Sequence, residues 1–362
     1  MKDMLTRINR ISDLLAPNES AIITSDISIT YLTGFQHSEG YVVITKENAY
    51  MLVDFRYIED AEKRVSHIPV LSYTSPYEKI GEVLKVEDIN TILLERNNVT
   101  LSGYDNFVKE LKDFEFDATD RLSQCISDMR IVKSECEMEK LRKAQKIAEE
   151  AYLELLDFIK IGMTEKEISA KLEYLMKTKG AEKVAFDLIT VTGKKTSLPH
   201  GVPSDDNKIC DGDFITFDIG AVFEGYHSDM TRTIGIGNVT DEQIEIYNTV
   251  LKAHLAGLEA VKAGVSGYDV DKTARDIIKE AGYGDYFGHS TGHGVGLEIH
   301  EAPYASVKSK DILKAGMTLT VEPGIYLPDK FGVRIEDTVI VTENGYETLA
   351  SIPKELIILS DY

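Results

Sequence analysis

In the first ~120 residues, short β-rich runs alternate with stretches in which apolar residues have helical spacing. Leu5, Ile8, Ile11 and Leu15 fall on one face of a helix, which predicts a helix over 4–15. Five runs rich in β-branched and aromatic residues predict strands over 21–24, 41–45, 50–53, 69–73 and 91–95. Strands and helices that alternate in this way are typical of an α/β domain.

A long charged helix is predicted to open the second part of the chain. Ser134 and Glu137 have the spacing of a capping box, in which the two residues satisfy each other's backbone donors at a helix start. Apolar residues at helical spacing continue to about Ile159, and Gly162 is expected to end the helix. We therefore place a boundary near residue 130, with an N-terminal domain over 1–125 and a second domain over 126–362.

The second domain contains an internal repeat. Segment 160–163 (Lys-Ile-Gly-Met) recurs as 262–265 (Lys-Ala-Gly-Val), 102 residues later. In each copy a helix begins after a polar cap, Thr164 or Ser266, and ends at a glycine. Downstream, segment 211–218 matches 315–322 at an offset of 104 residues. The pattern predicts two helix-plus-hairpin units packed face to face about a pseudo-two-fold axis.

Each predicted hairpin carries two acids. In the first hairpin, Asp218 pairs either with Asp229 or, through a turn at 224–225, with residue 231. Both registers put the two carboxylates on one face, because side chains alternate with period two. Glu322 and Glu336 lie on the two strands of the second hairpin. We expect the four acids at equivalent places in two equivalent hairpins.

Four carboxylates among apolar strand residues cannot all stay ionised without compensating positive charge. These strands contain no cluster of Lys or Arg that supplies it. Two divalent cations would balance the four charges, as in two-metal hydrolytic sites. The alternative is four unrelated strand acids, some exposed or salt-bridged, which is the usual explanation for any single one of them.

Histidines offer a nitrogen ligand. The glycine-rich segment 288–296 presents His289 and His293, and His300 follows shortly after. The segment lacks the lysine of a P-loop and the glutamate of an HExxH helix, and its glycines disfavour a helix. A core histidine is the usual explanation for one such residue. Three histidines so close together favour a functional site over a structural role.

The composition excludes several classes of protein. Among 362 residues, 40 Lys and Arg face 61 Asp and Glu, and the net charge of −21 argues against nucleic acid as a partner. No apolar run approaches a membrane span, and the N-terminus lacks a signal-peptide pattern. Three cysteines without a CxxC motif indicate free, mostly packed thiols in a reducing compartment. We expect an acidic, soluble, cytoplasmic protein without a nucleic-acid or membrane partner.

Several blocks resemble the Xaa-Pro branch of the pita-bread metallopeptidases, which comprises aminopeptidase P and prolidase (Xaa-Pro dipeptidase). The blocks are 31–35 (YLTGF), 54–57 (DFRY), 197–201 (SLPHG), 226–233 (YHSDMTRT), 291–303, 321–324 (VEPG) and 332–337 (GVRIED). The resemblance covers essentially the whole chain. It implies an α/β (α+β) fold, with a creatinase/prolidase-type N-terminal domain and a catalytic pita-bread domain built on a pseudo-two-fold repeat.

The resemblance also implies a metal centre. The family's ligands fall on Asp218, Asp229, His293, Glu322 and Glu336, with Asp229 and Glu336 bridging two divalent ions. Four oxygen ligands and one imidazole suit Mn(II), Co(II), Fe(II) or Zn(II), and we expect Mn(II). The implied reaction is hydrolysis of Xaa-Pro bonds in short peptides by a metal-bridging hydroxide.

The family's catalytic residues map onto further positions. Glu322 would relay a proton to the leaving proline nitrogen. His200 and His300 would stabilise the tetrahedral intermediate or position the carbonyl, and His289 would lie beside the proline pocket. Arg334 lies two residues before the bridging glutamate and on the same strand face. It would hold that carboxylate in place without binding the metal itself. No role is assigned to two neighbouring residues, His227 and Asp337.

Two other functions remain possible on this fold: a creatinase-like C–N hydrolase that works without metals, and a catalytically silent pita-bread binding protein. Both usually lack part of the ligand set, which is complete here. Family members are commonly homodimers, so we expect a homodimer that acts on short proline-containing peptides.

The choice between dipeptidase and aminopeptidase P stays open. A prolidase binds the free carboxylate of a dipeptide, which favours a dedicated Arg or Lys. Some prolidases place Arg directly after the Pro of the HE-x-P block, where this chain has Tyr304. The sequence at 288–290 (Gly-His-Ser) is closer to aminopeptidase P, whereas the chain length resembles many bacterial prolidases. Lys194 and Lys195 are candidate anion contacts.

Overall fold

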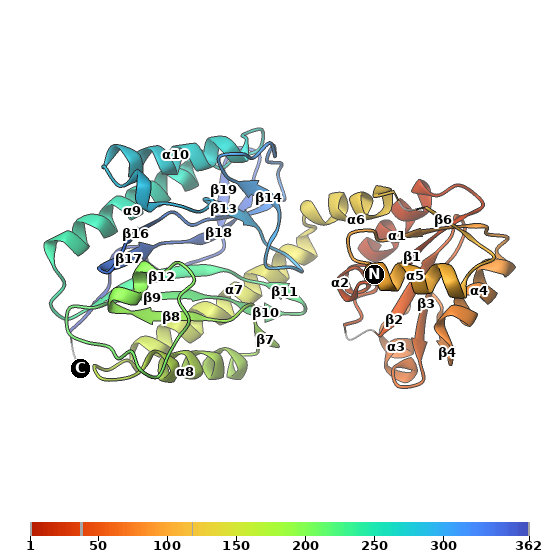
Figure 1. Cartoon of the computed structure of the whole chain (residues 1–362), viewed down its shortest axis with the longest axis horizontal. Helices are drawn as coiled ribbons and strands as arrows, with labels where there is room; N and C mark the ends of the chain where they lie inside the picture. The colour runs from red at the N-terminus through yellow and green to blue at the C-terminus, as the bar shows by residue number, and fades with distance from the viewer. Residues whose placement is uncertain (1, 37–38, 118, 361–362) are drawn as a thin grey trace. The chain divides into compact units, whose positions relative to one another are not determined.

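The computed structural model describes residues 2–36, 39–117 and 119–360. The chain forms two compact units, Met1–Arg130 and Ile131–Tyr362 (Figure 1). The division expected after residue 125 falls within helix α6 (Arg121–Ile131), and the structural division lies at the end of this helix.

The first unit is an α/β domain built on a six-stranded sheet with the order β4-β3-β2-β1-β5-β6. β1 runs antiparallel to β2 and parallel to β5. Its strands are β1 (Glu19–Ile23), β2 (Gly40–Ile44), β3 (Ala49–Asp54), β4 (Val70–Tyr73), β5 (Thr91–Leu94) and β6 (Glu115–Asp117). Its helices, besides α6, are α1 (Lys2–Leu14), α2 (Asp26–Thr33), α3 (Ile58–Arg64), α4 (Pro76–Val86) and α5 (Leu101–Glu110). The predicted helix and five predicted strands are confirmed, with ends that differ by at most two residues.

The inner strands of the first sheet, β1, β2, β3 and β5, are mostly buried because they are largely apolar, whereas the edge strands β4 and β6 are partly exposed. Ile22, Val43, Leu52 and Ile92 are fully buried, and Leu84 of α4 packs into the same cluster. Burial of side chains of this size stabilises a fold by about 1.5–3 kcal/mol each. This unit therefore has a core of its own.

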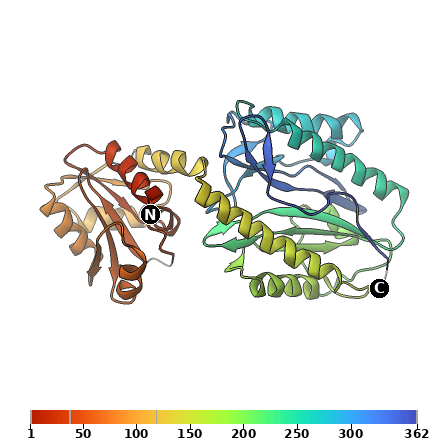
Figure 2. The ribbon, with the colours of Figure 1, turned by 180° about the vertical axis from the view of Figure 1, so that it is seen from behind.

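The second unit places its strands between two helix pairs (Figures 1 and 2). One pair is α7 (Glu135–Leu156) with α8 (Glu165–Thr178), and the other is α9 (Asp241–Ala260) with α10 (Gly267–Glu280). The strands of the first half are β7 (Lys183–Val184), β8 (Ile189–Thr192), β9 (Phe214–Ile219), β10 (Ala221–Phe223), β11 (Tyr226–His227) and β12 (Met230–Ile236). Those of the second half are β13 (Gly292–Gly294), β14 (Glu301–Ala305), β15 (Thr318–Val321), β16 (Gly324–Leu327), β17 (Phe331–Arg334), β18 (Asp337–Val341), β19 (Tyr346–Thr348) and β20 (Ile358–Leu359).

The predicted repeat is present in the backbone. Gly162 and Gly264 both have φ of +87°, a left-handed conformation that favours glycine. Thr164 caps α8 and Ser266 caps α10, and each side chain accepts a hydrogen bond from the backbone three residues later. The two copies of the helix start are therefore built alike.

The first hairpin adopts the second of the two registers considered above. Asp218 lies opposite Thr231, and the chain turns at Glu224 and Gly225, which have φ of +46° and +81°. Asp229 is thus a diagonal neighbour of Asp218 on the same face.

The second hairpin corrects the expectation of four equivalent positions. The registers of β15 with β18 and of β16 with β17 place Glu322 opposite Glu336. Glu322 is therefore the counterpart of Asp218, but the counterpart of Glu336 is Thr231. The physical reason is the turn: two residues separate the paired Phe223 and Tyr226, whereas three separate the paired Leu327 and Phe331. Because Asp229 lies two residues before Thr231, all four acids still share one face.

Candidate metal centre

All nine residues predicted for the site line one cavity of about 660 Å³ in the second unit. They are His200, Asp218, Asp229, His289, His293, His300, Glu322, Arg334 and Glu336. Asp218 lies on β9, Glu322 directly follows β15, and Glu336 lies between β17 and β18. The repeat therefore brings together residues that are more than 130 positions apart in sequence.

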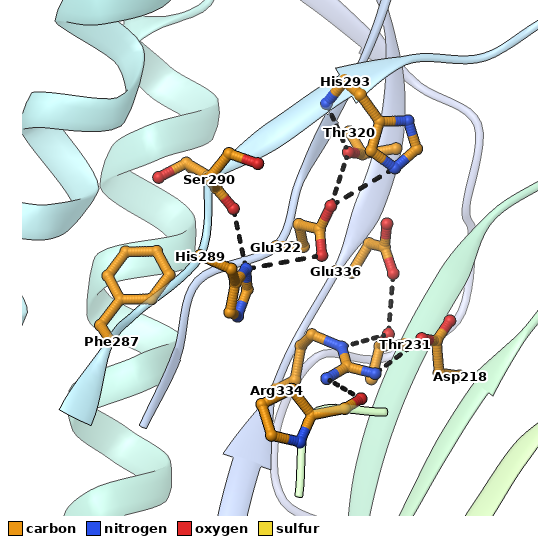
Figure 3. Close-up of polar contacts among 12 residues, drawn as sticks. Asp218, Thr231, Phe287, His289, Ser290, His293, Thr320, Glu322, Arg334 and Glu336 are labelled. Carbon is orange, nitrogen blue, oxygen red and sulfur yellow. Dashed lines mark hydrogen bonds and ion pairs between the residues drawn. The ribbon is translucent and has the colours of Figure 1, made fainter. Parts of the chain in front are cut away.

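Asp229, His293 and Glu336 form the tightest group of possible ligands. One ligand atom of each lies within 4.8 Å of the others, and all three residues are buried. His293 Nε2 is 3.6 Å from Asp229 Oδ2 and 3.5 Å from Glu322 Oε1. A nitrogen lone pair and several carboxylate oxygens thus face the same small space (Figure 3).

Thr320 fixes His293 relative to Glu322. Its hydroxyl accepts a hydrogen bond from the backbone N–H of His293 at 3.0 Å and donates one to Glu322 Oε1 at 3.2 Å (Figure 3). This contact requires β13 to pass very close to β15. A Cβ atom on Gly292 would lie 1.8 Å from the Thr320 carbonyl oxygen, which explains the glycine before His293.

Arg334 makes contacts that differ from the expected ones. Its Nη2 pairs with Asp218 Oδ2 at 2.6 Å, rather than with Glu336. The link to Glu336 runs through Thr231, whose hydroxyl accepts from Arg334 Nε at 3.0 Å and donates to Glu336 Oε2 at 2.7 Å (Figure 3). Arg334 thus reaches one acid of each hairpin, one directly and one through a hydroxyl.

Tyr326 was not predicted and lies in the same network. Its hydroxyl contacts Arg334 Nη1 at 2.9 Å and His289 Nε2 at 2.8 Å. A signal was available in the sequence, because Tyr326 is four residues after Glu322 and alternation puts both on one face. His289 Nδ1 lies 4.0 Å from Glu322 Oε2.

Two family models match the chain. "Metallopeptidase family M24" matches residues 139–343, and "Creatinase/Prolidase N-terminal domain" matches residues 7–132. The chain belongs to metallopeptidase family M24.

Relatives with this domain pair share close to the full length. An Xaa-Pro dipeptidase of Pyrococcus furiosus is 41% identical over 358 residues, which cover 99% of this chain and 100% of the relative. The solved Xaa-Pro dipeptidase from Bacillus anthracis has a TM-score of 0.93 at 40% identity, covering 98% of this chain and 100% of that one. The solved X-Pro aminopeptidase from Thermotoga maritima has a TM-score of 0.91 at 38% identity, covering 96% and 100%. The predicted fold, a creatinase/prolidase-type domain followed by a pita-bread domain, is confirmed.

The electrostatics of this M24 site fit divalent cations. Burial raises the pKa of Asp229 and Glu336 well above their ordinary values, and repulsion from neighbouring carboxylates adds to the shift. Burial also raises the pKa of Glu322 to about 8, although Arg334 opposes the shift. Without metal these carboxyls therefore favour the protonated form, and bound metal ions would compensate the charge of the ionised form.

The histidines have the protonation state that a ligand needs. Burial lowers the pKa of His293 to about 4 and that of His289 to about 4. A neutral ring has one nitrogen lone pair free for a metal. His293 Nδ1 lies 3.0 Å from the Gly294 carbonyl, so Nδ1 donates and Nε2 presents its lone pair to the acids.

The two lysines considered as anion contacts lie outside the cavity, whereas Tyr304 is part of its wall. Lys195 pairs with Glu165 at 2.6 Å, and neither Lys194 nor Lys195 lines the cavity. Tyr304 lines the cavity and is 45% exposed.

The three cysteines are free. Cys136 and Cys210 are exposed, so the expectation that most thiols are packed is wrong. Within the described residues, no helix combines the length and apolar character of a membrane span.

Proposed function

We propose that this M24 protein hydrolyses the peptide bond between an N-terminal residue and a following proline, with two divalent metal ions. The observation that carries the proposal is the convergence of Asp218, Asp229, His293, Glu322 and Glu336 on one cavity. The names of the relatives support Xaa-Pro bonds as the target. A complete set of possible ligands favours a peptidase over a silent binding protein or a metal-free creatinase-like hydrolase.

The five residues would hold the two ions, and we propose Mn(II), with Co(II), Fe(II) and Zn(II) as chemically suitable alternatives. When bound, the ions would supply an activated water and Lewis acidity at the scissile carbonyl. The neutral His293 ring and the carboxylates provide the donor atoms for this charge.

Side chains around the cavity would move protons and orient the substrate. Glu322, half-buried at the cavity wall, would carry a proton from the attacking water to the leaving proline nitrogen. His300 is exposed, with its ring centroid 4.4 Å from that of His293, and would donate to the developing oxyanion together with His200. His289, fixed by Tyr326, would border the proline.

We further propose that peptides that continue beyond the proline are the better substrates. A dipeptide presents its carboxylate directly after the proline, and such a group favours an available Arg or Lys. Among the described residues that line the cavity, Arg334 is the one Lys or Arg. It already donates to Asp218, Thr231 and Tyr326. We therefore expect Ala-Pro-Ala to be a better substrate than Ala-Pro.

Initial rates on three peptides test this function. Protein stripped of metal and reconstituted with Mn(II) should release alanine from Ala-Pro-Ala fastest, from Ala-Pro more slowly, and from Ala-Ala-Ala hardly at all. The stripped protein should be inactive. Inactivity on both proline peptides with metal bound would favour the binding protein, and activity without metal would favour the creatinase-like hydrolase. A faster rate on Ala-Pro would identify a dipeptidase.

We also propose a cytoplasmic homodimer, on the basis of the family resemblance and the three free thiols. Light scattering during size-exclusion chromatography should give a molar mass twice the 40.4 kDa of one chain, and the mass of a monomer would contradict the dimer.

A further inference from the structure

A buried charged cluster lies behind the acids of the proposed metal centre, and the sequence pattern assigned it no role. Asp337, fully buried, directly follows Glu336. Its Oδ1 pairs with Arg232 Nη2 at 2.7 Å, and its Oδ2 lies 2.9 Å from His254 Nε2 and 3.0 Å from Lys354 Nζ. Burial alone raises the pKa of Asp337, but these three groups outweigh burial and hold the pKa below its ordinary value.

His254, on α9, joins the two strands that lead into the metal centre. Its Nδ1 lies 2.9 Å from the carbonyl oxygen of Val321, which forms the peptide bond with Glu322. Its Nε2 contacts Asp337, the residue after Glu336. Val321 and Asp337 face each other as the last pair of β15 and β18 before the two glutamates. One fully buried ring therefore fixes both members of this pair.

The ring contacts are polar on both sides. A backbone carbonyl only accepts, so Nδ1 donates to Val321. An ionised carboxylate also only accepts, so a proton on each ring nitrogen satisfies both contacts of His254 at once. Burial opposes that charge and lowers the pKa of His254, whereas Asp337 acts in the opposite direction.

Arg232 also holds the backbone at Glu336. Its Nη1 donates to the Glu336 carbonyl at 2.6 Å and to the Thr231 carbonyl at 2.9 Å. The Glu336 backbone is thus fixed from the first hairpin, while His254 fixes the strand pair from α9.

The internal repeat provides a comparison within the chain. The offset of 102 residues that relates the helix ends pairs His254 with Tyr152 of α7. Tyr152 packs on Phe217 of the first hairpin, and its hydroxyl has no hydrogen-bond partner among the described residues. The polar double contact therefore belongs to the second copy, whose hairpin carries two facing glutamates.

We propose that His254 is a positioning residue of the metal centre, which holds Glu322 and Glu336 at the separation that metal binding needs. It touches neither the cavity nor the proposed ligands and would act through the backbone of Val321 and through Asp337. The inference rests on the metal site of the proposed function. Mutation of a residue that orients a metal ligand typically lowers metal affinity or activity about 10–100-fold.

Two substitutions separate the contacts of the ring. His254→Asn keeps a donor near the Val321 carbonyl, and His254→Gln keeps one that can approach Asp337. We expect each to weaken Mn(II) binding in calorimetry about 10-fold or more. We also expect each to change the visible absorption of the Co(II)-loaded protein, which reports ligand geometry.

A control on the same helix separates positioning from stability. Gln243, buried in the first turn of α9, donates to the Gly212 carbonyl at 2.9 Å and does not contact the Asp337 cluster. Gln243→Met removes a buried hydrogen bond and should lower the melting temperature of the metal-free protein without changing Mn(II) affinity or the Co(II) spectrum.

The outcomes are distinct. His254 variants that only melt earlier, with wild-type metal affinity and Co(II) spectrum, would overturn the inference. If these variants do not fold, Lys354→Met decides, because Lys354 is partly exposed and contacts Asp337 without filling the core. Weaker Mn(II) binding in this variant supports the inference, and unchanged binding overturns it. Failure of the wild type to bind metal would instead overturn the proposed function.

Discussion

At the scale of single residues, the four acids differ in how their charge is compensated. Asp218 has a direct ion pair with Arg334. No Lys or Arg in the described part of the chain forms such a pair with Asp229 or Glu336, and burial raises the pKa of both. The site therefore has one acid compensated by the protein and others whose charge calls for metal.

Arg334 should not be replaceable by lysine. The guanidinium donates through three nitrogens to Asp218, Thr231 and Tyr326, whereas an ammonium is a compact point charge on a flexible stem. We expect Arg334→Lys to lower kcat/KM on Ala-Pro-Ala by about 10–100-fold, the effect typical of losing a partner that orients a metal ligand. Arg142→Lys, at an exposed bidentate pair with Glu347, is the matched control and should change the rate less than twofold. Equal rates in the wild type and Arg334→Lys would contradict this role of the guanidinium group.

Glu322 should make the metal-free protein sensitive to alkaline pH. Its pKa rises from 4.5 to about 8 on burial, so the stability associated with the protonated carboxyl is complete below pH 4.5 and is lost as the pH rises through 8. Relative to metal-free Glu322→Gln, the metal-free wild type should lose roughly 3–6 °C of melting temperature between pH 5 and pH 9. Glu343→Gln, on an exposed part of the same unit, is the control. A melting difference independent of pH would refute this account.

At the scale of elements, the centre depends on how closely neighbouring strands of the second half approach. β13 delivers His293 to the acids because Gly292 lets it lie against β15. Period-two alternation also keeps all four acids on one face of the hairpins, although the turns of the two hairpins differ in length.

Gly292→Ala should separate His293 from the acids. The added Cβ would lie 1.8 Å from the Thr320 carbonyl oxygen, so one strand has to move. We expect Mn(II) affinity to fall by about 10-fold or more, together with a lower melting temperature. Gly288→Ala, in the same segment with open space around its Cβ position, should bind Mn(II) like the wild type. Wild-type affinity in Gly292→Ala would show that the close approach is unnecessary.

Much of this arrangement could be predicted because it is written in local patterns. Runs rich in β-branched and aromatic residues identified the strands of the first unit. A capping spacing identified the start of α7, where the Ser134 backbone N–H donates to Glu137. The repeat then located the acids as a set. These signals depend on residues close in sequence, or on two copies of one motif.

The rest depends on tertiary packing that no local pattern contains. The length of each hairpin connection decided that Thr231, not a fourth equivalent acid, faces Asp218. The direct partner of Arg334 depends on the approach of two hairpins, so proximity in sequence to Glu336 did not reveal the ion pair with Asp218. His254 lies on a helix more than 60 residues before Val321, and only the folded unit shows its role.

At the scale of the whole molecule, all nine site residues belong to the unit Ile131–Tyr362, and the unit Met1–Arg130 has its own sheet and core. Divalent ions that bind the folded second unit should therefore stabilise it by mass action.

Metal content at equilibrium tests the central claim most directly. The wild type, stripped of metal and dialysed against Mn(II), should retain two ions per chain by elemental analysis. The double variant Asp229→Asn, Glu336→Gln should retain neither, because it lacks both residues proposed to bridge the ions. A wild type without bound metal, or a double variant with the same metal content as the wild type, would contradict the two-metal centre.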